Sequence, residues 1–158
     1  MARSSRATYE FRHPFRAPLG YVYAWCTDYS IDDPRLAREE YTRRLLGRTA
    51  RRVIFEDLED QPDGWHWSHD VITLRPPNRW HADVTGSHRH WKIDYALREL
   101  PRGGCELHFH GRRTVTALGG TNPSQREMLA ELRTLWGNYA AALERDFRSS
   151  GRRRTTAR

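Results

Sequence analysis

Four polar side chains occupy positions where the sequence pattern calls for an apolar residue, and they are the first candidates for chemistry. His13, His69 and Arg113 share the phase of large apolar neighbours on their segments, and Asp57 is a less regular fourth. Burying a polar group costs free energy unless a protein group or a bound molecule satisfies it. Arg113 and His69 are therefore candidates to orient a carboxylate, phenol or carbonyl, with His69 moving a proton near neutral pH. An internal ion pair between Asp57 and Arg113, or positions at a sheet rim that reaches water, would explain the same pattern.

The other histidines raise the question of a metal site, because paired imidazoles on one face of a strand are common zinc ligands. By strand phase, however, they belong to the outer, solvated face of the sheet, and no cysteine or clustered carboxylate completes a tetrahedral set. The residues concerned are His66, His81, His88, His90, His108 and His110. We expect no bound metal ion and no other cofactor.

Motifs for covalent or phosphate chemistry do not stand out. The sequence offers no Ser-His-Asp arrangement, glycine-rich phosphate loop or pair of catalytic carboxylates. Cys26 and Cys105 lie far apart without metal-ligand spacing, which is typical of reduced cysteines that serve as packing residues. Any catalysis must therefore come from positioning and from single acids or bases.

The net charge of +7 on 158 residues belongs to the two ends of the chain. Residues 7–147 hold 20 basic and 20 acidic groups, so the body carries no global basic field. The excess arises from Arg3, Arg6, Arg148, Arg152, Arg153, Arg154 and Arg158. We predict flexible basic segments at 1–6 and 149–158, through which nucleic acid is an alternative partner. No apolar run approaches the roughly 20 residues of a membrane span and residues 1–6 lack a secretory signal, so a cytoplasmic location is expected.

The first fifty residues predict one strand and two short helices. Tyr9, Phe11, His13 and Phe15 alternate with polar residues, as in a half-buried strand. Pro18 then suits a first helical turn, and apolar residues recur at helical spacing as far as about residue 28. The second helix is expected to start at Asp33 and Pro34 and to end at Gly47, with these apolar anchors: Leu36, Tyr41, Leu45 and Leu46.

An antiparallel meander and a long helix are predicted for the rest of the chain. The expected strands are 53–58, 65–74, 80–85, 90–100 and 105–116, separated by short turns. Alternation predicts that one face of each strand is apolar and faces inward. The inward-facing residues are Trp65, Trp67, His69 and Val71 on strand 65–74, Trp80, Ala82 and Val84 on strand 80–85, Trp91, Ile93 and Tyr95 on strand 90–100, and Phe109 and Arg113 on strand 105–116. Asn122 as N-cap and Pro123 at the first position predict a helix of about 25 residues that ends at Gly151.

This order of elements resembles the helix-grip fold of the START-like superfamily, also called SRPBCC, which includes polyketide cyclases and aromatases, Bet v 1-type proteins and lipid-transfer domains. The resemblance covers about residues 7–148 as one domain. It depends on the opening strand, on the final helix led by Pro123, and on the residues Ala17, Pro18, Val22, Tyr23, Trp25 and Asp28. It implies an α+β fold: a curved antiparallel sheet of about six strands wrapped around the long C-terminal helix, with two short helices after the first strand.

The resemblance further implies a cavity between sheet and helix that holds an apolar or aromatic small molecule, lipid-like or polyketide-like, and it supplies no universal catalytic residue. We predict that the following residues bind this ligand: Trp25, Tyr29, Trp67, His69, Trp91, Tyr95, Phe109, Arg113, Leu132, Trp136 and Tyr139. The chain would act as a carrier, or as a cyclase or dehydratase without a covalent intermediate. Two alternatives stay open at this point: an aromatic-rich core with no usable void, and a START-like protein that associates with ribosomes or RNA through its arginine-rich ends.

Overall fold

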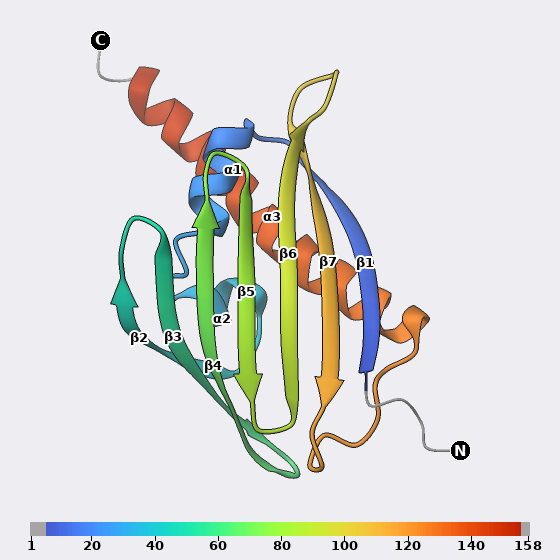
Figure 1. Ribbon diagram of the computed structural model, residues 1–158. Helices are drawn as coiled ribbons and strands as arrows, with labels where there is room; N and C mark the ends of the chain where they lie inside the picture. Colours follow the sequence, from blue (N-terminus) through green and yellow to red (C-terminus); the bar gives the residue numbers. More distant parts are fainter. Residues whose placement is uncertain (1–5, 156–158) are drawn as a thin grey trace.

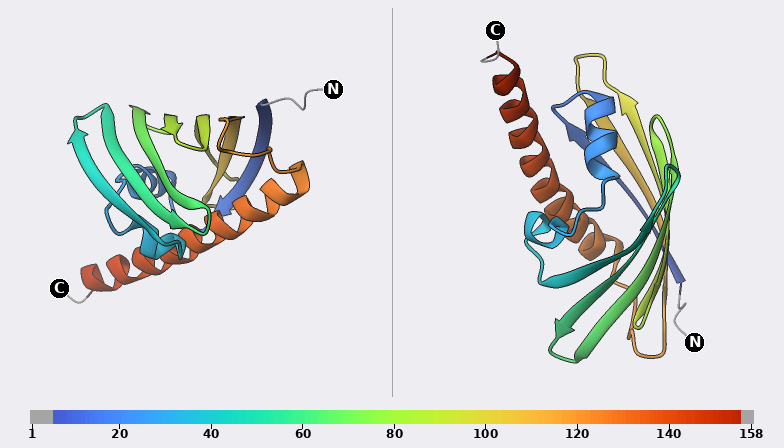
Figure 2. Two further views of the ribbon diagram at one scale, coloured as in Figure 1. Left: turned by 90° about the horizontal axis from the view of Figure 1, so that it is seen from below. Right: turned by 90° about the vertical axis from the view of Figure 1, so that its left-hand side faces the viewer.

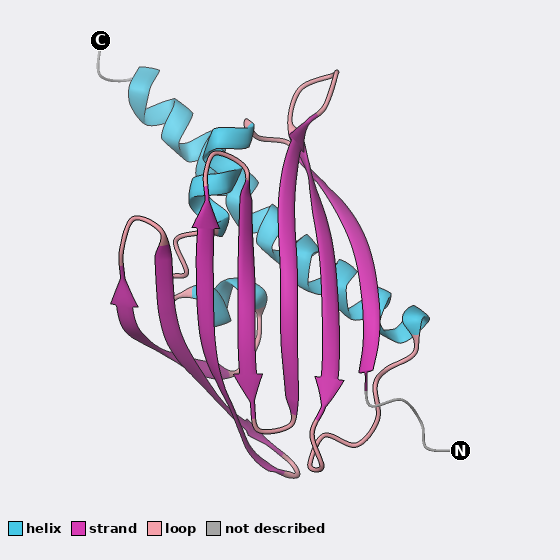
Figure 3. Cartoon of the chain, viewed as in Figure 1, coloured by secondary structure: helices cyan, strands magenta, loops and turns pink. Residues whose placement is uncertain are grey.

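The computed structural model describes residues 6–155, and it describes side chains for residues 6–150. Its centre is one antiparallel sheet in the order β1-β7-β6-β5-β4-β3-β2 (Figures 1 and 3). The strands are β1 (Arg6–Phe15), β2 (Tyr41–Arg48), β3 (Arg52–Gln61), β4 (Gly64–Arg75), β5 (Arg79–Gly86), β6 (Arg89–Glu99) and β7 (Cys105–Val115). The α+β architecture is confirmed, with seven strands where the sequence predicted about six.

Three helices lie on one side of the sheet, which curves around them (Figure 2). They are α1 (Leu19–Cys26), α2 (Asp33–Ala37) and α3 (Gln125–Thr155). The 31-residue α3 runs diagonally across the concave face, from the β1 edge toward the β2 edge. None of the helices in residues 6–155 is long and apolar enough to cross a membrane.

The segment after α2 differs from the prediction. Residues 41–48 form the edge strand β2 and not the second half of a helix, because α2 ends at Ala37. Arg38, which follows it, adopts a left-handed backbone with φ of 59°, and its N–H bonds back to Arg35 and Pro34. Gly47 lies inside β2, where the pairing with β3 shifts register after Leu45, and so it does not end a helix.

The start of α3 also differs from the prediction, which placed the cap at Asn122. Ser124 caps the helix instead: its hydroxyl accepts a hydrogen bond from the Glu127 N–H at 3.2 Å. The Glu127 carboxylate accepts one from the Ser124 N–H at 2.8 Å, which completes a capping box. At its other end the helix continues through Gly151 to Thr155, so Gly151 does not terminate it.

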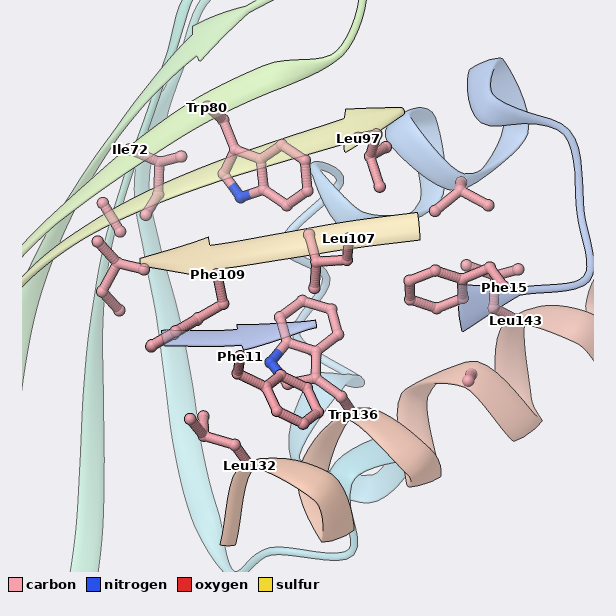
Figure 4. Packing of buried hydrophobic residues seen from close by; sticks show 14 of the residues in the cluster. Phe11, Phe15, Ile72, Trp80, Leu97, Leu107, Phe109, Leu132, Trp136 and Leu143 are labelled. Carbon is pink, nitrogen blue, oxygen red and sulfur yellow. The ribbon is translucent and has the colours of Figure 1, made fainter. Parts of the chain in front are cut away.

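The buried core lies between the concave face of the sheet and α3 (Figure 4). Trp136 of α3 lies against Phe15 of β1, with ring centroids 6.3 Å apart, and against Tyr95 of β6 at 5.9 Å. Leu143, further along α3, is fully buried. Burying side chains of this size contributes about 2–3 kcal/mol each, so this contact fixes α3 on the sheet.

Strand β4 has the opposite phase from the one predicted. Ile72 and Leu74 are buried, whereas Trp65 and Trp67 are 61% and 49% exposed. The register explains this, because residues directly opposite each other on neighbouring strands share a face. Asp70, Ile72 and Leu74 pair with Val84, Ala82 and Trp80 of β5, whose inward orientation agrees with the prediction. On β4, Asp70 therefore faces inward and His69 does not.

Candidate functional site

A pocket of about 490 Å³ lies between the concave face of the sheet, α1 and the first half of α3. Nine of the eleven predicted ligand-binding residues line it: Trp25, Tyr29, Trp91, Tyr95, Phe109, Arg113, Leu132, Trp136 and Tyr139. They come from α1 and the segment after it, from β6 and β7, and from α3. The elements that build the core therefore also bring together most of the side chains that the sequence singled out.

Trp67 and His69 do not line this pocket, because of the phase of β4 described above. His69 lies on the outer face, where its Nδ1 atom is 3.7 Å from a carboxylate oxygen of Glu56 on β3. Its side chain is 41% exposed. His69 is thus not placed to move a proton within the pocket. His13 does face inward, between Phe11 and Phe15, but it does not line the pocket. Burial lowers its pKa, an effect that the charge of Glu144 partly offsets.

Of the four polar residues that the sequence analysis singled out, Arg113 is the one that lines the pocket. It is 8% exposed on the inner face of β7, with its guanidinium 5.9 Å from the ring centre of Trp91. One nitrogen, Nη1, donates to the Asn122 side chain at 2.7 Å, while Nε has no hydrogen-bond partner among the described residues. Burial, and then the charge of Arg89, lowers its pKa. The predicted pair with Asp57 is not formed.

Asp70 is a pocket residue that the sequence analysis missed. Its Oδ1 atom is buried and lacks a hydrogen-bond partner among the described residues. Burial raises the pKa of Asp70 to about 6, partly offset by the Ser68 hydroxyl. Burial also raises the pKa of the neighbouring pocket phenols of Tyr29 and Tyr95, which therefore stay protonated at neutral pH. The inward phase of β5, extended through the register to Asp70, is the signal that identifies it.

A second buried arginine, Arg43 of β2, lines the same pocket but is fully paired. Asp57 of β3 accepts hydrogen bonds from its Nε and Nη2 atoms at 2.8 and 2.9 Å, and Asp33 of α2 accepts one from Nη1. The guanidinium also lies 4.0 Å from the ring centre of Phe55. Asp57 therefore forms its ion pair with Arg43 and not with Arg113. Because the sequence predicted a helix as far as Gly47, this cluster was not foreseen.

Two of the six histidines depart from the predicted outer face. His81 and His108 lie there, bonded to Asp94 and Glu10 at 2.8 and 2.7 Å. His66 and His88 instead line a smaller hollow of about 250 Å³ that shares several wall residues with the main pocket. Asp63 lies beside both of them, so these two histidines do have the neighbouring carboxylate that the sequence analysis did not find.

Known proteins resemble this chain in structure, although no protein-family model and no curated protein matches the sequence. The Zhui aromatase/cyclase from Streptomyces sp. R1128 aligns with a TM-score of 0.63 at 13% identity, covering 96% of this chain and 97% of that one. The structure of Ara h 8.0201 aligns with a TM-score of 0.66 at 10% identity, covering 91% and 99%. The chain has the helix-grip fold. A third structure, the di-domain aromatase/cyclase BexL from the BE-7585A biosynthetic pathway, aligns with a TM-score of 0.60 at 15% identity, covering 90% of this chain and 49% of that one.

Proposed function

We propose that this START-like chain binds a small apolar or aromatic molecule in the pocket between the sheet and α3. The pocket volume of about 490 Å³ falls in the range of small-molecule sites, and its walls combine aromatic rings with a few polar groups. Trp91, Tyr95 and Trp136 offer ring faces and edges for an aromatic guest. Proteins of this fold named as aromatase/cyclases are consistent with such a ligand.

The observation that carries the proposal is the pair of unsatisfied polar atoms in the pocket wall. The Arg113 Nε and Asp70 Oδ1 atoms are buried without a hydrogen-bond partner among the described residues. Leaving such an atom unpaired costs about 1–3 kcal/mol, and more when the group is charged. A guest that accepts from Arg113 and donates to Asp70 removes this cost, so we expect an aromatic ring that carries both an acceptor and a hydroxyl.

A second candidate is a cyclase or dehydratase that works without a covalent intermediate. With a pKa of about 6, Asp70 can accept or return a proton near neutral pH, the role first assigned to His69. A nucleophilic thiol is not at hand, because burial raises the pKa of Cys26 well above its ordinary value. Catalysis would then consist of holding a flexible chain in a folded shape beside one acid or base.

The role in nucleic-acid binding receives no support from the structure or from the comparisons. It depends on the arginine-rich ends, of which residues 1–5 and 156–158 lie outside the described residues. The body adds no net positive charge, since residues 7–147 are neutral overall.

The first experiment fills the pocket. Val84 of β5 lines it, and the adjacent Thr85 is exposed on the opposite face. We expect Val84→Trp to weaken binding of the fluorescent probe 8-anilinonaphthalene-1-sulfonate by about tenfold or more, because the indole occupies the space of the probe. Thr85→Trp adds the same ring outside the pocket and should bind as the wild type does. Equal affinity of both variants, or a wild-type chain that does not bind the probe, contradicts the proposal. Native mass spectrometry of the purified chain would then identify a co-purified guest.

A further inference from the structure

We propose that Asp63, His66 and His88 form a binding site for a divalent transition-metal ion such as Zn²⁺. The three residues come from two hairpins: Asp63 lies in the β3–β4 turn, His66 near the start of β4, and His88 in the β5–β6 turn. Both turns lie at the same end of the sheet (Figure 1). One ligand atom from each residue lies within 4.8 Å of the other two. This inference replaces the expectation of a metal-free protein, and it does not depend on the proposed ligand of the main pocket.

The spacing of the ligand atoms suits a tetrahedral ion. His66 Nε2 lies 2.9 Å from Asp63 Oδ1, and His88 Nε2 lies 3.8 Å from Asp63 Oδ2. With bond lengths of about 2.0–2.2 Å, two ligand atoms of tetrahedral zinc lie about 3.4 Å apart. The two observed distances, one to each oxygen of the carboxylate, lie on either side of that value, so rotation of the Asp63 side chain can bring one oxygen into reach of an ion held by both imidazoles.

His88 has a hydrogen-bond acceptor beside each of its ring nitrogens. Ser87 Oγ lies 2.8 Å from Nδ1, and a carboxylate oxygen of Asp63 lies 3.8 Å from Nε2. In the tautomer that carries its proton on Nδ1, this N–H donates to Ser87 Oγ and the lone pair on Nε2 faces the carboxylate of Asp63. In that tautomer two acceptors face each other, which favours a cation between them.

The two imidazoles are held in a fixed, parallel arrangement. Their ring centroids are 3.5 Å apart with an interplanar angle of 19°, and both Nε2 atoms are directed to the one carboxylate. The side chains of His66 and His88 are only 18% and 14% exposed. Few side-chain rotamers remain to be restricted when an ion binds, which lowers the entropic cost of binding.

The backbone around His88 is fixed on both sides. The Ser87 N–H donates to the Trp67 carbonyl at 2.9 Å, which joins the turn to β4. The Thr116 N–H donates to the His88 carbonyl at 3.0 Å, which joins it to the end of β7. Gly119 packs so closely that a Cβ atom would lie 1.8 Å from the same carbonyl oxygen. This backbone support is what a preorganised metal site requires.

The donor set indicates the class of ion. Two imidazoles and one carboxylate suit zinc and its neighbours in the first transition row, and they are too few and too nitrogen-rich for calcium or magnesium. Three protein ligands leave a coordination position open, as in catalytic zinc sites. His66 and His88 also line the smaller hollow, which shares Asp70 and Trp91 with the main pocket. An ion bound here would therefore lie at one end of the proposed ligand site.

The test is a titration of the full, untagged, chelator-treated chain with Co²⁺, followed by its visible d–d absorption and by competition with Zn²⁺. We expect saturable binding of one ion per chain. His66→Ala and His88→Ala should each weaken Co²⁺ binding by at least about tenfold, because loss of a supporting second-sphere group alone costs that much. Asp63→Asn leaves both imidazoles in place and removes only the charge of the carboxylate. Because Asp63 is exposed, the fold is expected to tolerate this change.

The matched control is His81→Ala, which also removes an imidazole bonded to a carboxylate, that of Asp94 at 2.8 Å. It should bind Co²⁺ as the wild type does. Absence of saturable wild-type binding overturns the proposal. Equal loss in His81→Ala and His88→Ala overturns it too, because binding would then be spread over surface histidines. Circular dichroism of each variant checks that the fold is retained, and if His88→Ala unfolds, Asp63→Asn decides the question.

Discussion

The two buried arginines of the main pocket have opposite surroundings. The side chain of Arg43 is 6% exposed and is bonded to two carboxylates. Arg113, of which 8% of the whole residue is exposed, donates one hydrogen bond to a neutral amide. Burial lowers the pKa of both, but for Arg43 the bonds and charges of Asp57 and Asp33 outweigh it, so that the pKa is raised. The pKa of Arg113 stays lowered.

The difference shows which side of the pocket is structural and which can recognise a guest. On the β2 side all polar groups of the Arg43 cluster are satisfied within the protein, so a ligand there finds no free donor. On the β7 side the Nε atom of the buried Arg113 has no partner among residues 6–150 and can donate to a further group. A polar group of a guest is therefore expected to bind beside β7, with its apolar part toward the aromatic wall.

The largest expected effect is the loss of Arg43. Arg43→Met leaves Asp33 and Asp57 largely buried without their shared counter-charge, and we expect the free energy of unfolding at pH 7 to fall by about 3–5 kcal/mol. Urea denaturation followed by circular dichroism measures it. Arg44→Met is the control, because Arg44 is 75% exposed and only 3.8 Å from its partner Glu56. A similar small change in both variants would show that the Arg43 cluster is not structural.

The next effect separates binding from stability at Arg113. We expect Arg113→Met to change the free energy of unfolding by less than about 1 kcal/mol, because the lost bond is offset by the removal of a poorly satisfied buried charge. Binding of 8-anilinonaphthalene-1-sulfonate should weaken by about tenfold or more, since its sulfonate loses a charged donor. Arg112→Met, on the outer face of the same strand, should leave probe binding unchanged. If probe affinity survives in Arg113→Met, the guest does not use this group.

The smallest of the three effects concerns Asp70 of β4, a strand that lies between those of the two arginines in the order of the sheet. Its pKa is raised from 3.8 to about 6 in the folded chain, so the folded state binds the proton more tightly than the unfolded state. The stability that this gives is present below pH 4 and is lost as the pH rises through about 6. Asp70→Asn should therefore be more stable than the wild type at pH 7.5, by about 1–2 kcal/mol, and lose most of that gain at pH 4.

Urea denaturation at the two pH values tests this expectation. The control is Asp83→Asn, the same change on the outer face of β5, where the carboxylate is 46% exposed and lies 3.3 Å from Lys92. A pH-independent difference for Asp70→Asn would mean that Asp70 is not a buried acid, and the second candidate function would lose its proton carrier.

The predictions of inward-facing residues agree best with the structure where the pattern within one helix or strand is enough to show which face is buried. The alternation on β6 and β7 and the apolar stripe of α3 are local patterns, and they place Trp91, Phe109 and Trp136 correctly in the pocket wall. Arg113 follows from the same reasoning, because strand phase alone buries it. These predictions need no knowledge of what lies opposite.

The sequence predictions were wrong where pairing with a neighbouring strand determines the secondary structure or the face on which a side chain lies. Residues 41–48 have apolar side chains at Tyr41 and Leu45, four apart, which fits a helix, but pairing with β3 makes them a strand. On β4 the two tryptophans suggested an inward face, although the register with β5 turns Trp67 outward and Asp70 inward. The cluster of Asp63, His66 and His88 could not be predicted for the same reason, because it forms only when two turns more than twenty residues apart in the sequence lie side by side.

The irregular edge strand has a consequence for self-association. A regular outer strand offers its free backbone groups to the strand of another molecule, and the exposed Leu45 and Leu46 of β2 would add apolar attraction. The change of register between Leu45 and Gly47 interrupts the even spacing of those backbone groups, and the charges of Arg44 and Arg48 flank the break. Both features disfavour the pairing of β2 with an edge strand of a second molecule, and so they disfavour aggregation through this edge.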